Sequence, residues 1–170
     1  NPQYFIENQR NGHNPHRELD YRTSAKVIID HVIKGVEIAR KHKLPEKIID
    51  FIRTHHGNST VQYFYRSFIN DNPQGEVDIN EFTYPGPRPF SRETCVLMMA
   101  DSVEAASRTL KIYDPESIHE LVENIVAHQS REEQFSDASL TFRDITAIKE
   151  IFKNRLSNIY HSRIEYPAAP

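Results

Sequence analysis

The chain has 170 residues, a formal net charge of −3, and 38% hydrophobic and 26% charged residues. This composition fits one soluble domain that is large enough for a hydrophobic core, and the charge gives no reason to expect a nucleic acid polymer as a partner. The single cysteine, Cys95, excludes an internal disulfide framework, and no apolar run approaches the roughly 18 residues that a membrane span needs.

The opening segment, residues 1–21, is rich in Asn, Gln, Pro and His and has no sustained period. We expect an ordered loop with a turn of helix near Tyr4–Gln9. His13 and His16 lie in this loop, where they are poorly placed to act as fixed metal ligands.

The next stretch predicts a long helix with a histidine on its buried face. Thr23 or Ser24 can cap a helix that runs to about Lys43. One stripe of that helix collects Val27, Ile28, His31, Gly35 and Ile38. His31 on this stripe is either a hydrogen-bonded core residue or a metal ligand.

The segment Ile48–Asn58, IIDFIRTHHGN, predicts an apolar helix that ends in two histidines and a glycine. Pro45 fits the start of this helix, and Gly57 can take the left-handed conformation that ends one. His55 and His56 lie three or four residues after apolar positions, so both imidazoles point roughly toward the core. The alternative is that they are two polar residues closing a surface helix.

An aromatic helix and a long irregular loop follow. Ser59 can cap a helix containing Tyr63 and Tyr65, whose aromatic side chains either pack in the core or stack on a purine. Residues 70–90 contain four prolines and two glycines, and a loop of this length is typical of a functional lid or a mobile excursion.

Three more helices are expected in the second half of the chain. Ser91 can cap a helix to about Leu110, Asp114-Pro115 can start one to about Gln129, and Thr141-x-x-Asp144 forms a capping box for one to about Tyr160. No segment alternates as a strand does. The predicted fold is therefore all-α, with about six or seven helices and a long Pro/Gly-rich loop, in a single domain over residues 1–170.

Asp101 is the fourth residue with ligand chemistry, and it falls on an apolar stripe of the helix after Ser91. A buried carboxylate needs a hydrogen bond, an ion pair or a metal. Imidazole and carboxylate ligands suit divalent ions such as Mn, Fe or Zn, and no usable thiolates are present to favour softer metals. The sequence therefore indicates a mixed site made of His31, His55, His56 and Asp101.

Several blocks of the sequence resemble one family from end to end. The segments DHVIKG, HHGNS and MMADSVEAASR are similar to those of HD-domain metal phosphohydrolases. More narrowly, YFIENQ, HHGNSTVQYFY, YPGPRP, ADSVEAASR and HSRIEYP resemble the cytosolic catalytic domain of the seven-transmembrane HD-domain cyclic di-AMP phosphodiesterases of bacteria. The resemblance implies an HD-type helical bundle on the cytoplasmic face of the cell membrane, attached through upstream segments of the parent protein.

The same resemblance implies a two-metal centre that activates a metal-bound water. Carried over by position, His31, His55, His56 and Asp101 are its ligands, and the two divalent transition ions are manganese or iron. The family's His-Asp pair, with the helices that carry it, would lie upstream of Asn1. We therefore expect the chain as given to be a domain without its first helices, with weak metal binding and little hydrolysis.

The implied activity is hydrolysis of cyclic di-AMP to the linear dinucleotide, a step of second-messenger turnover. Arg108 could face the substrate phosphates or pair with Glu104, and the YPGPRP loop, with Tyr84 and Arg88, could cover the ligand or act as a rigid spacer. Two alternatives stay open: another HD phosphohydrolase acting on nucleotides or cyclic di-GMP, and a non-catalytic helical signalling module.

Overall fold

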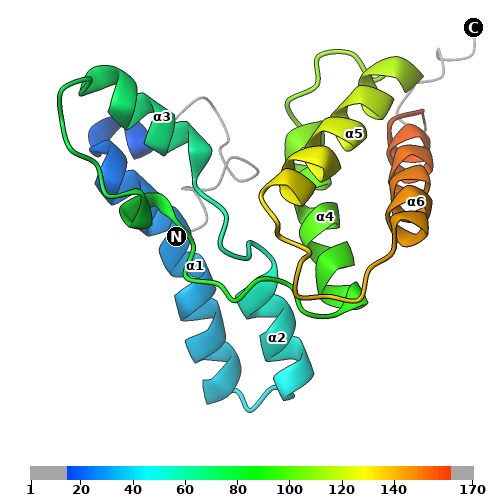
Figure 1. Cartoon of the computed structure of the whole chain (residues 1–170), viewed down its shortest axis with the longest axis horizontal. Helices are drawn as coiled ribbons and strands as arrows, with labels where there is room; N and C mark the ends of the chain where they lie inside the picture. The colour runs from blue at the N-terminus through cyan, green and yellow to red at the C-terminus, as the bar shows by residue number, and fades with distance from the viewer. Residues whose placement is uncertain (1–14, 162–170) are drawn as a thin grey trace, which may run out of the picture. The chain divides into compact units, whose positions relative to one another are not determined.

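The computed structural model describes residues 15–161, and its elements in that part of the chain are α-helices and short 3-10 helices with no β-strand (Figure 1). The α-helices are α1 Tyr21–Lys41, α2 Glu46–Thr54, α3 Gln62–Asp71, α4 Arg92–Ser107, α5 Pro115–Arg131 and α6 Phe142–His161, and the 3-10 helices are η3 Pro15–Glu18 and η4 Ile79–Phe82. The all-α prediction is confirmed. The turn of helix expected near Tyr4–Gln9 lies outside the described residues.

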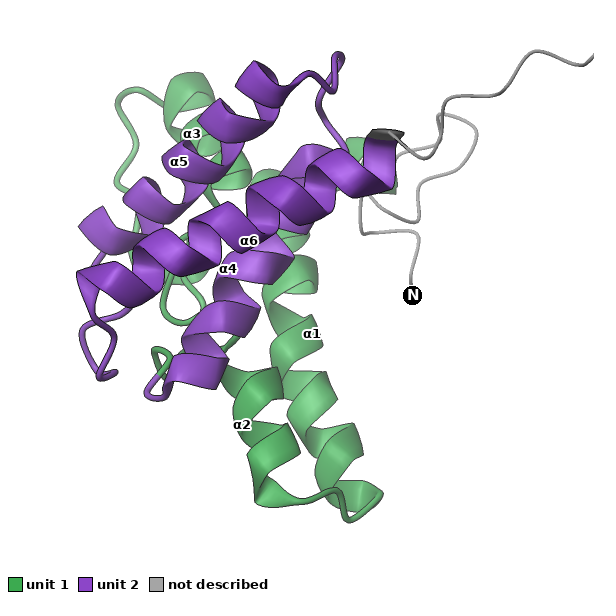
Figure 2. Cartoon of the chain, turned by 90° about the vertical axis from the view of Figure 1, so that its right-hand side faces the viewer, with its two compact units in different colours: residues 1–89 green, residues 90–170 purple. Residues whose placement is uncertain are grey.

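The chain divides into two compact units, which are coloured separately in Figure 2. Unit 1 comprises Asn1–Pro89 and unit 2 comprises Phe90–Pro170. Each described part has its own apolar core. The core of unit 1 contains Ala25, Ile29, Val32, Phe64, Phe82 and Tyr84. The core of unit 2 contains Cys95, Met98, Met99, Val103, Ile118, Val122, Val126, Phe135 and Leu156.

In unit 1, α1 and α2 lie side by side as a helical hairpin (Figure 1). The N-cap of α1 is Asp20, whose carboxylate accepts the Thr23 amide at 2.9 Å, so the prediction that Thr23 or Ser24 caps this helix is wrong. An aspartate can serve as well as a hydroxyl because it accepts the same backbone N–H group. The turn between the helices passes through Lys43, which has a left-handed φ of 54°, and Pro45 stands directly before α2.

The Pro/Gly-rich segment is held to unit 1 by specific contacts. Phe82, at the end of η4, is completely buried in the core between α1 and α3. The backbone amide of Val61 donates to Phe82 at 2.7 Å, and that of Tyr84 donates to Ser59 at 2.9 Å. Nothing in the sequence indicates this anchor, because a single buried phenylalanine in a polar loop has no periodicity.

The start of α3 also differs from the prediction. Val61 is its N-cap residue, and no side chain caps this helix. The Ser59 hydroxyl, expected to do so, donates instead to the carbonyl oxygen of His56 at 2.7 Å.

In unit 2, α4, α5 and α6 pack against one another, and their N-termini follow the predicted capping chemistry. Ser91 and Thr94 form a capping box at α4, Asp114 accepts the Ser117 amide at α5, and Asp144 accepts from the Thr141 amide and hydroxyl before α6. These caps are local in sequence, which is why the sequence predicts them.

Candidate metal centre

Three histidines converge in unit 1. His31 comes from the middle of α1, His55 is the C-cap residue of α2, and His56 follows it. One ligand atom from each ring can be chosen so that all three lie within 4.8 Å of one another. The structure therefore brings together three of the four ligands proposed from the sequence, all of them half-buried.

Each of two rings is oriented by a carbonyl of its own helix. His31 Nδ1 lies 2.5 Å from the Ile28 carbonyl oxygen, and His55 Nδ1 lies 2.7 Å from that of Ile52. A carbonyl oxygen only accepts hydrogen bonds, so both Nδ1 atoms must carry the proton. In a neutral ring with Nδ1 protonated, Nε2 carries the lone pair, and a backbone partner on Nδ1 is the usual arrangement for a metal-ligating histidine.

The two Nε2 atoms face each other, with His31 Nε2 3.0 Å from His55 Nε2. Two nitrogens at this distance share a proton or a metal ion, because two unshared lone pairs would repel. Two nitrogen ligands roughly 2.1 Å from one ion and about 90° apart are about 3.0 Å from each other. The donor set therefore fits a divalent metal, which His31 and His55 could hold together.

His56 completes the cluster from the turn after α2. Its ring centroid lies 4.1 Å from that of His55 and 5.0 Å from that of His31. Gly57, with φ of 54°, reverses the chain directly afterwards. Burial, with His55 and His31 nearby, lowers the pKa of His56 to about 2, so this ring is neutral at physiological pH and able to act as a ligand.

Tyr84 brings the Pro/Gly-rich loop onto the cluster. Its ring stacks on His56 with centroids 4.4 Å apart and an angle of 22°, and it meets His31 edge-on at 6.1 Å. A Cβ built on Gly86 would lie 3.8 Å from the Gly57 carbonyl oxygen, so the loop also touches the turn after α2. Arg88, further along this loop, is half-buried.

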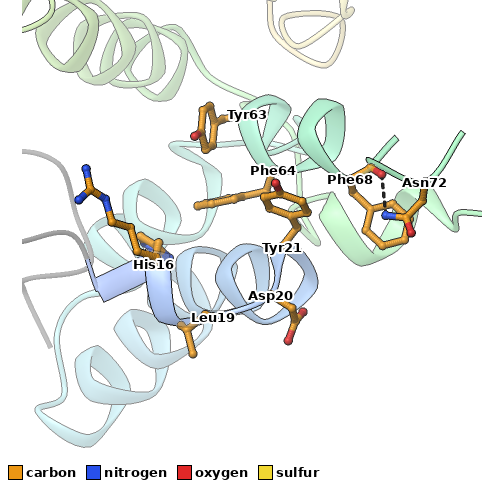
Figure 3. A pocket seen from close by; sticks show the side chains of 9 residues that line it. His16, Leu19, Asp20, Tyr21, Tyr63, Phe64, Phe68 and Asn72 are labelled. Carbon is orange, nitrogen blue, oxygen red and sulfur yellow. Dashed lines mark hydrogen bonds between the residues drawn. The ribbon is translucent and has the colours of Figure 1, made fainter. Parts of the chain in front are cut away.

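The other aromatic residues proposed for substrate binding lie apart from this cluster. Tyr65 packs against Phe82 with ring centroids 5.7 Å apart, as the core alternative supposed. Tyr63 is 73% exposed and lines a pocket of about 530 Å³ that none of the three clustered histidines lines (Figure 3). The residues around this pocket are His16, Arg17, Leu19, Asp20, Tyr21, Tyr63, Phe64, Phe68 and Asn72.

Two proposed site residues belong to α4 and the turn after it, in unit 2. Asp101 is exposed, so the expectation that it is buried on an apolar stripe is wrong. The buried face of α4 instead holds Cys95, Met98, Met99 and Val103. Arg108 donates to Glu104 at 2.6 Å, which is the ion pair named as its alternative role. Whether Asp101 ligates a metal stays a prediction.

Sequence comparison identifies the class of this fold and site. The family model described as "HD domain" matches residues 9–106, which include all four proposed ligands. The chain belongs to the HD-domain family.

Named relatives show which members of this family the chain resembles. The chain is 41% identical to the cyclic-di-AMP phosphodiesterase PgpH of Bacillus subtilis and 35% identical to that of Listeria monocytogenes, over 99% and 98% of its length. It spans 23% of the length of each of these relatives.

Two crystal structures of the L. monocytogenes PgpH HD domain match the fold. One has a TM-score of 0.88 at 32% identity, covering 94% of this chain and 74% of that chain. The other, a complex with cyclic-di-AMP, has a TM-score of 0.89 at 33% identity, covering 94% and 73%. The predicted HD-type helical bundle is confirmed. No helix in residues 15–161 has the length and apolar character to span a membrane.

Proposed function

We propose that this chain is the catalytic region of a metal-dependent phosphodiesterase that hydrolyses cyclic di-AMP to the linear dinucleotide and so removes a second messenger. The observation that carries the proposal is the convergence of His31, His55 and His56, with the Nε2 atoms of His31 and His55 3.0 Å apart. The relatives support the substrate, because two are named cyclic-di-AMP phosphodiesterases and one solved neighbour is a complex with that dinucleotide. The proposed location is the cytoplasmic face of the bacterial cell membrane.

The proposed metal content is two divalent transition ions, manganese or iron. His31, His55, His56 and Asp101 are the proposed ligands from this chain, and we propose that the His-Asp pair of the family supplies the rest. When bound, the ions supply positive charge for the phosphoryl oxygens and activate the attacking water. A protein that lacks this pair is then expected to bind metal weakly and to hydrolyse little substrate.

The protein's own residues hold and orient the ligands. The Ile28 and Ile52 carbonyls hold Nδ1 of His31 and His55, which would leave Nε2 of each ring available to a metal ion. The stacked Tyr84 ring covers one face of His56 and restricts its rotation. We propose that Tyr84 and Arg88 on the loop contact the dinucleotide, and Tyr84 has the strongest support because its ring lies on the cluster. Contacts from Tyr63, Tyr65 and Arg108 stay predictions, since Tyr65 packs in the core and Arg108 pairs with Glu104.

The first test measures metal. A chain extended upstream to include the His-Asp pair is expected to bind close to two manganese or iron ions, and His56→Ala or Asp101→Ala is expected to lower that content. His119→Ala is a matched control, because His119 is exposed on α5 and is not in the cluster. Elemental analysis that finds unchanged metal in both ligand variants would reject the centre.

The second test compares substrates. Initial rates are measured with manganese for cyclic di-AMP, cyclic di-GMP and bis(4-nitrophenyl) phosphate. Faster opening of cyclic di-AMP supports the proposal, since base discrimination requires buried polar groups that pair with only one purine edge. Equal rates would indicate an unselective phosphodiesterase, and faster turnover of cyclic di-GMP would favour the alternative enzyme class. No hydrolysis by a metal-loaded protein would favour the signalling module.

A further inference from the structure

Gly35 lies in the middle of α1, where glycine weakens a helix, and its place is explained by α2. A Cβ built on Gly35 would lie 2.9 Å from Cγ2 of Ile52, a separation that real Cβ contacts essentially never show. The backbone of Gly35 is ordinary helix, so its conformation does not require glycine. The requirement comes from the close approach of the two helices.

This contact lies one helical turn from the metal centre on both helices. Gly35 follows His31 by four residues, which places both on the same face of α1. Ile52 precedes His55 by three residues, and its carbonyl accepts the hydrogen bond from His55 Nδ1. The residue that touches Gly35 is therefore the residue that orients one ring of the facing pair.

We propose that the Gly35–Ile52 contact is a positioning device that sets the separation of α1 and α2 so that His31 and His55 can reach the same ion. The inference rests on the metal centre of the proposed function. An alanine at position 35 would bring its Cβ to 2.9 Å from Ile52 Cγ2, so Ile52 or the helix spacing must give by a few tenths of an ångström to reach ordinary contact. Metal ligands must be held within about 0.5 Å of their productive positions, so a displacement of this order passed to His55 would weaken ion binding.

The experiment measures manganese affinity by calorimetry in the upstream-extended chain. Gly35→Ala is expected to weaken binding by roughly 10–100-fold, the range seen when the support of a ligand is disturbed. Gly75→Ala is the matched control, because a Cβ there meets Asn72 at only 3.4 Å, and its affinity should equal that of the original protein. Gly35→Ala/Ile52→Leu removes the Cγ2 methyl group, keeps the side chain's carbon count, and should restore affinity.

Metal-free measurements separate positioning from folding. The melting temperature of metal-free Gly35→Ala is expected to move by less than about 4 °C, because the better helix former offsets the crowding. The ring ¹⁵N resonances of its His55 should shift as the Ile52 carbonyl moves, and the double variant should reverse the shift.

Equal manganese affinity for Gly35→Ala and the original protein overturns the inference. If Gly35→Ala does not fold, the double variant decides: recovered affinity supports positioning, and failure to recover it overturns positioning. If the original protein binds no manganese, the proposed metal centre fails, and the metal-free His55 resonances alone then decide the Gly35 inference, with an unchanged spectrum overturning it.

Discussion

Replacing Tyr84 separates the packing of the Pro/Gly-rich loop from its effect on the metal centre. Its side chain is only 7% exposed and its ring stacks on His56. A tyrosine that buries roughly 150–250 Å² contributes about 4–6 kcal/mol at ~25 cal/mol per Å². This is an upper bound, because the unfolded chain already buries part of that area. Tyr84→Ala should therefore lower the free energy of unfolding by about 3–5 kcal/mol.

Two further variants divide this loss into its causes. Tyr84→Phe keeps the ring and should stay within about 1.5 kcal/mol of the original protein, the usual worth of one hydroxyl hydrogen bond. Tyr84→Leu keeps apolar volume without a ring, and its extra loss from the missing stack is expected to be about 0.5–1.5 kcal/mol. Manganese affinity should fall for the leucine variant and persist for the phenylalanine variant, because only an aromatic ring fixes the plane of His56.

The assays are urea unfolding of the metal-free protein, followed at equilibrium, and manganese titration of the folded variants. If the free energy of unfolding of Tyr84→Ala lies within about 1 kcal/mol of that of the original protein, the loop is not anchored by this side chain, because effects that small are typical of exposed residues. Equal manganese affinity for the leucine and phenylalanine variants would refute the role assigned to the stack.

Two other predictions concern unit 2. Hydrogen bonds from Lys149 and Lys153 lower the pKa of Glu123 from 4.5 to about 2, so the ion pairs stabilise the fold above about pH 4.5 and the stabilisation is lost as pH falls toward 2. The full shift corresponds to about 3.4 kcal/mol, but the 35% exposure of Glu123 reduces this to about 1–2 kcal/mol. In urea titrations, Glu123→Gln should remove this stabilisation at pH 7 and should have a much smaller effect at pH 2. Burial, with Glu93 nearby, raises the pKa of Cys95 to about 11. A thiol reagent at pH 8 should therefore modify Cys95 no faster than the protein unfolds. Rapid labelling of the folded protein would contradict this.

The sequence predicts the helices of unit 2 well because their start signals are local. Ser91, Asp114 and the Thr141–Asp144 pair each cap within three residues of themselves, and the structure contains all of them. The α1 cap was assigned to the wrong residue because Asp20, Thr23 and Ser24 all have capping chemistry. Only the backbone path selects among such neighbours.

The site was predictable to the extent that helical faces are. The spacing of His31, His55 and His56 from apolar neighbours indicates inward rings, and the structure gathers them. Burial of Asp101 was wrong because α4 has apolar residues on several sides, and only packing shows that the Cys95–Met98–Met99 side faces the core. The Tyr84 stack depends on a non-local anchor at Phe82, which no spacing rule describes.

The backbone carbonyls and helix packing that position the metal ligands also belong to the fold of unit 1, which has a thermodynamic consequence. His31 and His55 are aimed by carbonyls of the helices that form the hairpin, and their Nε2 atoms are held 3.0 Å apart by helix packing. Two neutral rings with their lone pairs this close would repel each other, and a cation held by both nitrogens would remove that repulsion. Ion binding should therefore stabilise unit 1 by an amount that grows with the logarithm of ion concentration above the dissociation constant. The hairpin sets the geometry, and the metal relieves the local cost of holding that geometry.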